Sequence, residues 1–228
     1  MSALPRRVIE PLDVGLARGL DRDGFLLLRQ AFPAVWVEPL RERFEAGYIP
    51  SNQWPVPRGR EWRHALVDED PFVQSVCHLP VMLSAAARII GAPFFLAQAE
   101  GREPLAGGGA QPLHRDGAGV VSALVFLDPY GPDNGATRVA PGTHHGEPAN
   151  GADAETQALI IEGEPGDILL FDAELLHGGT LNRSGAPRRS LLVSYFPETA
   201  LQSHLSTRAA RNVRMEIAEI FEPAALTP

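Results

Sequence analysis

Two histidines and an aspartate have the residue types and the spacing of a metal site. His114 and Asp116 are separated by a single residue, and His177 follows a short apolar segment and a turn. In an extended segment, residues two apart point to the same side, so His114 and Asp116 would face one point. With His177 as a third ligand, the set would occupy one face of an octahedral metal ion and leave three positions open.

This ligand set favours iron. Two histidines and one carboxylate form the facial triad of non-haem iron oxygenases, whereas zinc would accept the same ligands without redox chemistry. Arg188 lies eleven residues after His177, at the head of an apolar segment. A guanidinium there can bind a carboxylate through two parallel hydrogen bonds.

The segments before residue 94 are expected to be mainly helical. A short helix is expected over residues 11–20, followed by a strand over 25–28, and another helix begins near Pro33, where apolar residues recur at helical spacing. Residues 48–64 contain three prolines and are expected to form a loop. A further helical region follows Pro71, is interrupted near Pro80 and ends at Gly91.

From Phe94 onward, short apolar runs alternate with clusters of Gly, Pro, Asp and Asn, which is typical of a barrel or a sandwich. The expected strands are residues 94–99, 119–127, 137–139, 159–161, 167–171 and 189–196. Residues 101–109 are glycine-rich and are expected to form a loop, and residues 205–221 are expected to be helical. We therefore expect one domain over residues 1–228, with a helix-rich part (1–93), a strand-rich core (94–197) and a C-terminal helical extension (198–228).

Composition and net charge limit the classes of binding partner and the cellular compartment that we expect for this protein. The 28 acidic and 20 basic side chains give a net charge of −8, which disfavours nucleic acid or an anionic membrane as a partner. No apolar run reaches the ~20 residues needed to span a bilayer. A single cysteine, Cys77, excludes an internal disulfide and is expected to be a buried apolar residue, so we expect a cytoplasmic protein. The sequence leaves the oligomeric state open.

Several stretches of the sequence resemble the phytanoyl-CoA hydroxylase family of Fe(II)- and 2-oxoglutarate-dependent dioxygenases. These are residues 113–117 (LHRDG), 133–144 (DNGATRVAPGTH), 166–171 (GDILLF), 177–179 (HGG), 182–184 (NRS) and 188–190 (RRS). The resemblance covers about residues 94–197 and implies a mainly β fold with flanking helices around a double-stranded β-helix, or jelly-roll, barrel of the cupin-like kind.

The resemblance also implies roles for individual residues. His114, Asp116 and His177 would bind Fe(II), and Arg188 would bind the distal carboxylate of 2-oxoglutarate. Arg189 is the adjacent alternative, but neighbours on a strand face opposite ways, so only one of the two arginines should point inward.

Other positions have weaker counterparts in the family. Gln98 and Gln111 resemble polar positions that help to hold the oxoacid, and Leu124 would form a wall of its pocket. Many relatives have Gln where this chain has Arg115, which should point away from the metal. His144 and His145 are expected to have structural rather than metal-binding roles.

The implied reaction is hydroxylation of an unactivated C–H bond of a small molecule, for instance a biosynthetic intermediate, with O₂ consumed and 2-oxoglutarate converted to succinate and CO₂. Related halogenases have Gly or Ala in place of the carboxylate ligand, whereas this chain has Asp116. Two alternatives stay open: a cupin-like metal enzyme that does not use 2-oxoglutarate, and a non-catalytic binding module on the same fold.

Residues 52–64 and the loop 101–111 are expected to cover the substrate pocket. Aromatic and basic side chains lie together in the first of these segments. We expect apolar walls from Trp54 and Trp62 and an anion contact from one of three arginines, namely Arg58, Arg60 or Arg63.

Overall fold

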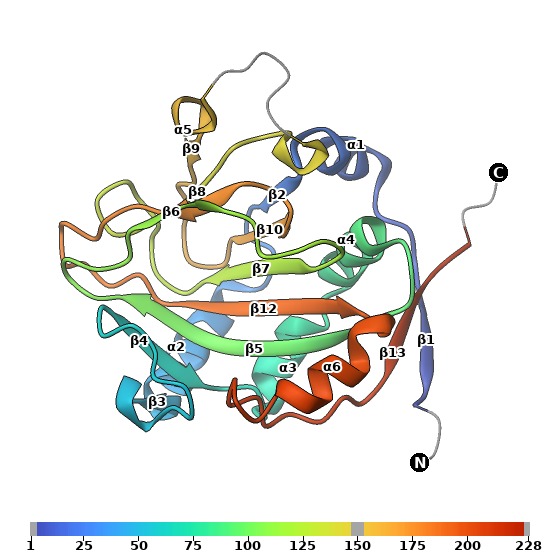
Figure 1. The fold of residues 1–228 in the computed structure, drawn as a ribbon, viewed down its shortest axis with the longest axis horizontal. Coiled ribbons are helices and arrows are strands. Elements are labelled where there is room, and N and C mark those ends of the chain that lie inside the picture. The colour runs from blue at the N-terminus through green and yellow to red at the C-terminus, as the bar shows by residue number, and fades with distance from the viewer. Residues whose placement is uncertain (1–3, 147–152, 226–228) are drawn as a thin grey trace.

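Two β-sheets face each other in the computed structural model, which describes residues 4–146 and 153–225 (Figure 1). In the described residues, the larger sheet has nine strands in the order β1-β13-β5-β12-β7-β10-β2, with β4 beside β5 and β3 beside β4. Its strands are β1 (Arg6–Ile9), β2 (Phe25–Leu28), β3 (Tyr48–Ile49), β4 (Trp62–Leu66), β5 (Phe94–Pro104), β7 (Val121–Phe126), β10 (Ile168–Asp172), β12 (Ser190–Pro197) and β13 (Ile220–Pro223). The smaller sheet has the order β6-β11-β8-β9, with β6 (Gln111–His114), β8 (Thr137–Val139), β9 (Leu159–Ile160) and β11 (His177–Gly179). This arrangement is the predicted jelly-roll fold.

The helices of the N-terminal part of the chain cover the outer face of the larger sheet (Figure 1). The α-helices are α1 (Val14–Asp23), α2 (Val37–Gly47), α3 (Pro71–Cys77), α4 (Pro80–Ile90), α5 (Ala154–Gln157) and α6 (Leu201–Thr207), and 3-10 turns occur at Ala34–Trp36, Ser51–Gln53, Thr143–His145 and Glu198–Ala200. Local signals set the helix ends: the Asp13 carboxylate accepts hydrogen bonds from two N–H groups at the start of α1, and Asp70 does the same for α3. Gly91 ends α4 in the left-handed conformation, as predicted.

The alternation of side chains along the central strands separates the core from the site. On β7, Val121, Ala123 and Val125 pack with the helices, whereas Leu124 and Phe126 belong to a second apolar cluster between the two sheets. On β12, the odd-numbered residues 191, 193 and 195 likewise join the helical core, while residues 190, 192, 194 and 196 line a cavity. One face of the larger sheet therefore stabilises the fold, and the other face forms part of the site.

Several sequence predictions about elements need correction. Residues 205–221 are not helical: α6 ends at Thr207, and the chain then turns and reaches β13. The expected glycine-rich loop is shorter, because β5 continues to Pro104 through pairing with both β4 and β12. Residues 48–64, expected to be loop, contain β3 and the start of β4. In each case pairing with distant strands overrides the local signal.

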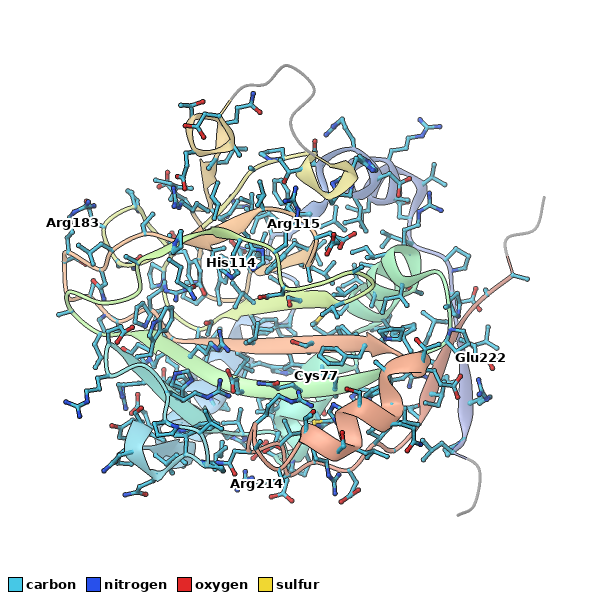
Figure 2. All side chains as sticks on the ribbon, viewed as in Figure 1. Cys77, His114, Arg115, Arg183, Arg214 and Glu222 are labelled. Atoms are coloured by element: carbon cyan, nitrogen blue, oxygen red, sulfur yellow. The ribbon has the colours of Figure 1, made fainter. Side chains whose placement is uncertain are left out.

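Cys77 is buried on α3, as predicted, and lies in the molecular interior in Figure 2. Burial raises the pKa of its thiol to about 12, so it is a poor nucleophile. Within residues 4–146 and 153–225, no single helix has the length and apolar character of a membrane span, although the bent pair α3 and α4 passes that test together.

Candidate active site

The pairing of β11 with β6 brings the two predicted metal-binding histidines together. His177 and His114 are direct partners in this antiparallel register, and their ring centroids lie 4.4 Å apart. The close approach of the two strands depends on Gly178, where a Cβ atom would lie 2.6 Å from the carbonyl oxygen of Gln111. The HGG sequence therefore positions a ligand and makes room for the neighbouring strand.

Asp116 completes a three-residue cluster. It follows β6, and its backbone N–H donates to the carbonyl of Ala173, which fixes the start of the loop. Its carboxylate oxygens lie 3.6 Å from Nε2 of His114 and 3.4 Å from Nε2 of His177. One ligand atom from each of the three residues lies within 4.8 Å of the other two, so the cluster could hold a metal ion.

The hydrogen bonds of the two imidazoles suit metal binding. Nδ1 of His114 lies 3.0 Å from the carbonyl oxygen of Pro112, and Nδ1 of His177 lies 2.8 Å from that of Leu175. A carbonyl only accepts, so each Nδ1 carries a proton, and Nε2 is the nitrogen of each ring that faces the cluster and could bind a metal. Carbonyl partners of this kind orient histidine ligands at metal sites.

Charge and exposure at the cluster are also consistent with a metal. Contact with the His177 imidazole is the largest influence on Asp116 and lowers the pKa of its carboxyl group, which is therefore ionised at neutral pH. His177 is buried, whereas the side chain of Asp116 is 51% exposed. The cluster is thus open to small molecules on its aspartate side.

Arg188 provides a buried cation in the lining of the same cavity as the cluster. Its side chain is 3% exposed, and its Nε and Nη1 atoms have no hydrogen-bond partner among the described residues. Its guanidinium carbon lies 4.5 Å from the centre of the Tyr130 ring. Burial lowers the pKa of Arg188, but an arginine remains charged at neutral pH. A buried guanidinium with unpaired N–H groups is unfavourable unless an anion binds it.

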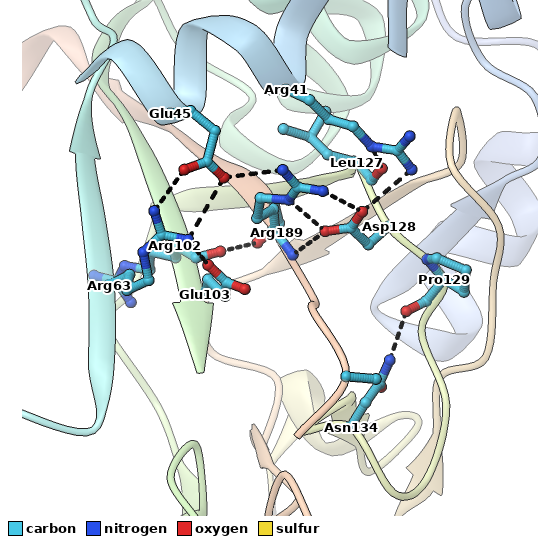
Figure 3. Close-up of polar contacts among 12 residues, drawn as sticks. Arg41, Glu45, Arg63, Arg102, Glu103, Leu127, Asp128, Pro129, Asn134 and Arg189 are labelled. Atoms are coloured by element: carbon cyan, nitrogen blue, oxygen red, sulfur yellow. Dashed lines mark hydrogen bonds and ion pairs between the residues drawn. The ribbon is translucent and has the colours of Figure 1, made fainter. Parts of the chain in front are cut away.

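Arg189 points to the opposite side of the strand, as the alternation predicts (Figure 3). Its Nε donates to Asp128 at 2.7 Å, and its Nη1 donates to Glu45 at 2.9 Å. Arg63 binds the same Glu45 at 2.6 Å, so Glu45 joins two arginines in a surface network. Arg189 is therefore structural, and Arg188 alone of the pair faces the cavity.

The cavity has a volume of about 480 Å³ and contains other predicted positions. Gln98, Gln111 and Leu124 all line it, together with the three residues of the cluster and Arg188. Gln98, however, accepts a hydrogen bond from Arg211 at 3.2 Å. The structure thus brings together every candidate site residue, and its contacts connect Gln98 to an arginine that the sequence did not suggest.

The residues expected to have structural roles lie outside the cluster. The Arg115 guanidinium donates to the carbonyls of Glu174 and Thr143, so it is directed away from the cluster. His144 and His145 both contact the backbone carbonyl of Asp21, at 3.1 and 2.7 Å.

The 52–64 segment contributes only part of what was expected. Arg58 and Trp62 line the cavity. Trp54 is buried beneath Arg58, whose guanidinium carbon lies 4.8 Å from the Trp54 ring, so Trp54 supports the wall from behind. Arg60 is exposed and lies outside the cavity lining, and Arg63 is occupied by Glu45 and Glu103.

Sequence reasoning missed Arg102 and Arg211, which also line the cavity. Arg102 is on β5, four residues after Gln98 and on the same face, so a longer predicted strand would have identified it. Arg211 lies in the turn after α6 and enters the cavity only because the C-terminal segment packs against β5 and β12. No local signal marks it.

The family model of phytanoyl-CoA dioxygenase (PhyH) matches residues 20–190, which is most of the chain. The chain belongs to this family. The family predicted from the sequence motifs is therefore confirmed.

Two curated relatives of this PhyH-family chain carry the name dioxygenase. Dioxygenase cdmA of Talaromyces verruculosus is 38% identical over 88 residues, which is 38% of this chain and 30% of cdmA. Dioxygenase olcK of Penicillium canescens is 25% identical over 240 residues, covering 92% of this chain and 79% of olcK. The first relatives are thus matched over about a third of their own length.

Two solved structures show the same fold. EctD from S. alaskensis with bound Fe has a TM-score of 0.68 at 19% identity and covers 95% of this chain and 90% of its own. The non-heme alpha ketoglutarate dependent epimerase SnoN from nogalamycin biosynthesis has a TM-score of 0.64 at 19% identity and covers 80% of this chain and 82% of its own. At this identity the likeness supports the fold alone.

Proposed function

We propose that this protein is an Fe(II)- and 2-oxoglutarate-dependent oxygenase that hydroxylates an unactivated C–H bond of a small molecule. The observation that carries this proposal is a single cavity with two complementary groups in its lining. One is the His114, Asp116 and His177 cluster, and the other is the buried guanidinium of Arg188, whose Nε and Nη1 have no hydrogen-bond partner among the described residues. A metal at the cluster and a dicarboxylate reaching Arg188 would satisfy both.

Each side chain then has a defined task. His114, Asp116 and His177 would hold Fe(II) on one face, with the Pro112 and Leu175 carbonyls fixing the imidazoles. Arg188 would bind the distal carboxylate of 2-oxoglutarate, and Gln111 and Leu124 line the same cavity. When bound, iron and 2-oxoglutarate supply the activation of O₂, with succinate and CO₂ as coproducts. The protein contributes position, charge and partial exclusion of water.

The first test is a spectrum of the anaerobic protein with Fe(II) and then 2-oxoglutarate. Chelation of the oxoacid by ferrous iron gives a weak metal-to-ligand charge-transfer band in the visible region. We expect the band in the wild type, its loss in His177→Ala, and a higher 2-oxoglutarate concentration for half-saturation in Arg188→Met. Arg189→Met is the matched control, because its guanidinium faces the other side of the strand.

The outcomes separate the alternatives. Fe(II) binding without a band would support a cupin-like metal enzyme that does not use 2-oxoglutarate. Absence of metal binding would support a non-catalytic binding module.

The reaction type needs a second measurement, because SnoN, which has a similar fold, is named an epimerase. With a substrate in hand, turnover under ¹⁸O₂ should place one labelled oxygen atom in the product and one in succinate if the protein is a hydroxylase. A product of unchanged mass would indicate epimerisation instead.

A further inference from the structure

A second basic group lines the active-site cavity, apart from Arg188. It consists of Arg58, Arg102 and Arg211, which come from three separate parts of the chain. Arg58 precedes β4, Arg102 is on β5, and Arg211 follows α6. Only tertiary packing brings these three positive charges together in the cavity. Like charges repel, so the negative charges that compensate them have to be identified.

A single carboxylate compensates two of these arginines. Glu100 is 2% exposed and lies 3.2 Å from Nη2 of Arg58 and 2.5 Å from Nε of Arg102. Burial would raise the pKa of Glu100, but Arg102 and Arg58 outweigh it and lower that pKa, so Glu100 is ionised. One negative charge thus stands against two positive charges before Arg211 is considered.

Arg211 has neutral partners only. Its guanidinium contacts Oε1 of Gln98 at 3.2 Å and Nδ1 of His204 at 2.9 Å, and no carboxylate oxygen within residues 4–146 and 153–225 lies at ion-pair distance from it. Burial, followed by the nearby charges of Arg211 and Arg208, lowers the pKa of His204 to about 4, so this imidazole is neutral at pH 7. Burial and then the charge of Arg58 lower the pKa of Arg211 itself, and the charge of Glu100 opposes them only in part.

The whole cavity has an excess of positive charge. Its lining has four arginines, and Asp116 is the one carboxylate among the lining residues that the structure describes. Beside the lining, Glu100 pairs with Arg58 and Arg102, whereas Glu103 acts on Arg188 but is itself paired with Arg63 at 2.7 Å. With Asp116 and Glu100 counted against the four arginines, two positive charges remain. Fe(II) and the 2-oxoglutarate dianion would cancel each other and leave this excess unchanged. Positive charge held in a half-buried cavity attracts and orients an anion.

We infer that Arg58 and Arg211 form an anion-binding subsite for the primary substrate, which bears a carboxylate or phosphate group together with an apolar part. The apolar part is suggested by Trp62, Leu192 and Phe196, which line the same cavity. Arg102 is paired with Glu100, so it does not bind the anion directly, but its positive charge adds to the attraction of the subsite for an anion. The subsite rests on the proposed function, since it assigns a substrate class to the same cavity.

Calorimetric titration of small probes tests this subsite. The probes are hexanoate, hexyl phosphate and hexanamide, which share a six-carbon chain and differ in the head group. The protein is loaded anaerobically with Fe(II) and saturating 2-oxoglutarate, so that Arg188 is occupied and cannot bind the probes. We expect saturable binding of an anionic probe and at least about tenfold weaker binding of hexanamide, as loss of a charged hydrogen bond implies. The stronger of the two anions identifies the head group as carboxylate or phosphate.

Variants locate the binding. Arg211→Gln and Arg58→Gln should each weaken the anion at least about tenfold, and Arg211→Lys should keep part of the affinity. Arg60→Gln is the matched control, because Arg60 belongs to the same segment as Arg58 but lies outside the cavity lining. An unchanged melting temperature and an unchanged 2-oxoglutarate band in Arg211→Gln would show that the fold and the oxoacid site are intact.

Three results would overturn the subsite: equal binding of hexanoate and hexanamide, no binding of either anion, or unchanged anion affinity in Arg211→Gln. Failure of the proposed function is recognised separately by the absence of the charge-transfer band in the wild type. In that case the titrations are repeated on metal-free protein that carries Arg188→Met, so that Arg188 cannot bind the probes. They still test whether Arg58 and Arg211 bind an anion.

Discussion

His177 and His114 are direct register partners on β11 and β6, and each has its Nδ1 within 3.0 Å of a backbone carbonyl oxygen two residues earlier in the chain. Side chains of directly opposed residues in an antiparallel pair lie close together on one face. The strand register therefore determines the distance between the imidazoles, and the carbonyls determine which nitrogen faces the cluster. Asp116 then needs only a short loop to reach both.

Removal of either imidazole should abolish tight metal binding. We expect His177→Ala or His114→Ala to weaken Fe(II) binding by more than about 100-fold, since changes to the partners of metal ligands alone can weaken binding by 10–100-fold. Anaerobic competition with a chelator measures this affinity. His144→Ala should match the wild type, because His144 contacts the Asp21 carbonyl outside the cluster; equal losses in all three variants would argue against the assigned ligands.

Gly178→Ala should damage the metal site without altering a ligand. The added Cβ would lie 2.6 Å from the carbonyl oxygen of Gln111, so β6 must move away from β11. We expect a loss of about 1–3 kcal/mol in the free energy of unfolding, as overpacking usually causes, together with weaker Fe(II) binding. Urea titration and metal competition measure the two effects. Gly131→Ala serves as the control, because its added Cβ meets no atom within 4 Å.

Substitution of Arg188 should change 2-oxoglutarate binding, whereas substitution of its neighbour Arg189 should change stability. Arg189→Met should reduce the free energy of unfolding by about 2–3 kcal/mol, below the ~3–5 kcal/mol of a fully unpaired buried charge, because Arg41 still lies 3.2 Å from Asp128. It should leave the 2-oxoglutarate affinity unchanged.

Arg188→Met should weaken 2-oxoglutarate binding without lowering the free energy of unfolding. It removes a buried guanidinium whose Nε and Nη1 have no partner among the described residues. Chemical denaturation and the charge-transfer band provide the two measurements. Loss of oxoacid binding in Arg189→Met, with normal binding in Arg188→Met, would contradict the assignment.

His64 should make the protein less stable in mild acid. Burial lowers the pKa of His64 to about 4, and Glu100 only partly opposes this effect. In the unfolded chain the pKa returns to about 6.5, so the unfolded state binds the proton first as the pH falls. The contribution of His64 is complete above about pH 6.5 and is lost as the pH falls toward the folded pKa.

Between pH 7 and pH 5 this loss should amount to about 2 kcal/mol of the free energy of unfolding. Urea titrations at the two pH values measure it. His64→Phe, which keeps an aromatic ring against Trp54, should show a correspondingly smaller dependence. The same dependence in the wild type and the variant would assign the effect to other groups.

The sequence by itself determined the family, the jelly-roll class and the positions that face the site. These depend on short-range patterns: the spacing of His114 and Asp116, the alternation that separates Arg188 from Arg189, and the glycines after His177. A period of two residues is a local property of an extended chain, so it can be read without knowledge of strand partners. The strand Phe25–Leu28 and the helix end at Gly91 were predicted correctly for the same reason.

Tertiary structure alone decided which distant residues share the cavity. The length of β5 depends on pairing with both β4 and β12, and that pairing brings Arg102 into the site. Arg211 lies more than 100 residues from Gln98, its hydrogen-bond partner, in a segment expected to be helical. Contacts between such distant residues depend on strand order and chain return, which local propensity does not encode. The cluster of His114, Asp116 and His177 was therefore predictable from sequence, whereas only Arg58 of the basic group was suggested by it.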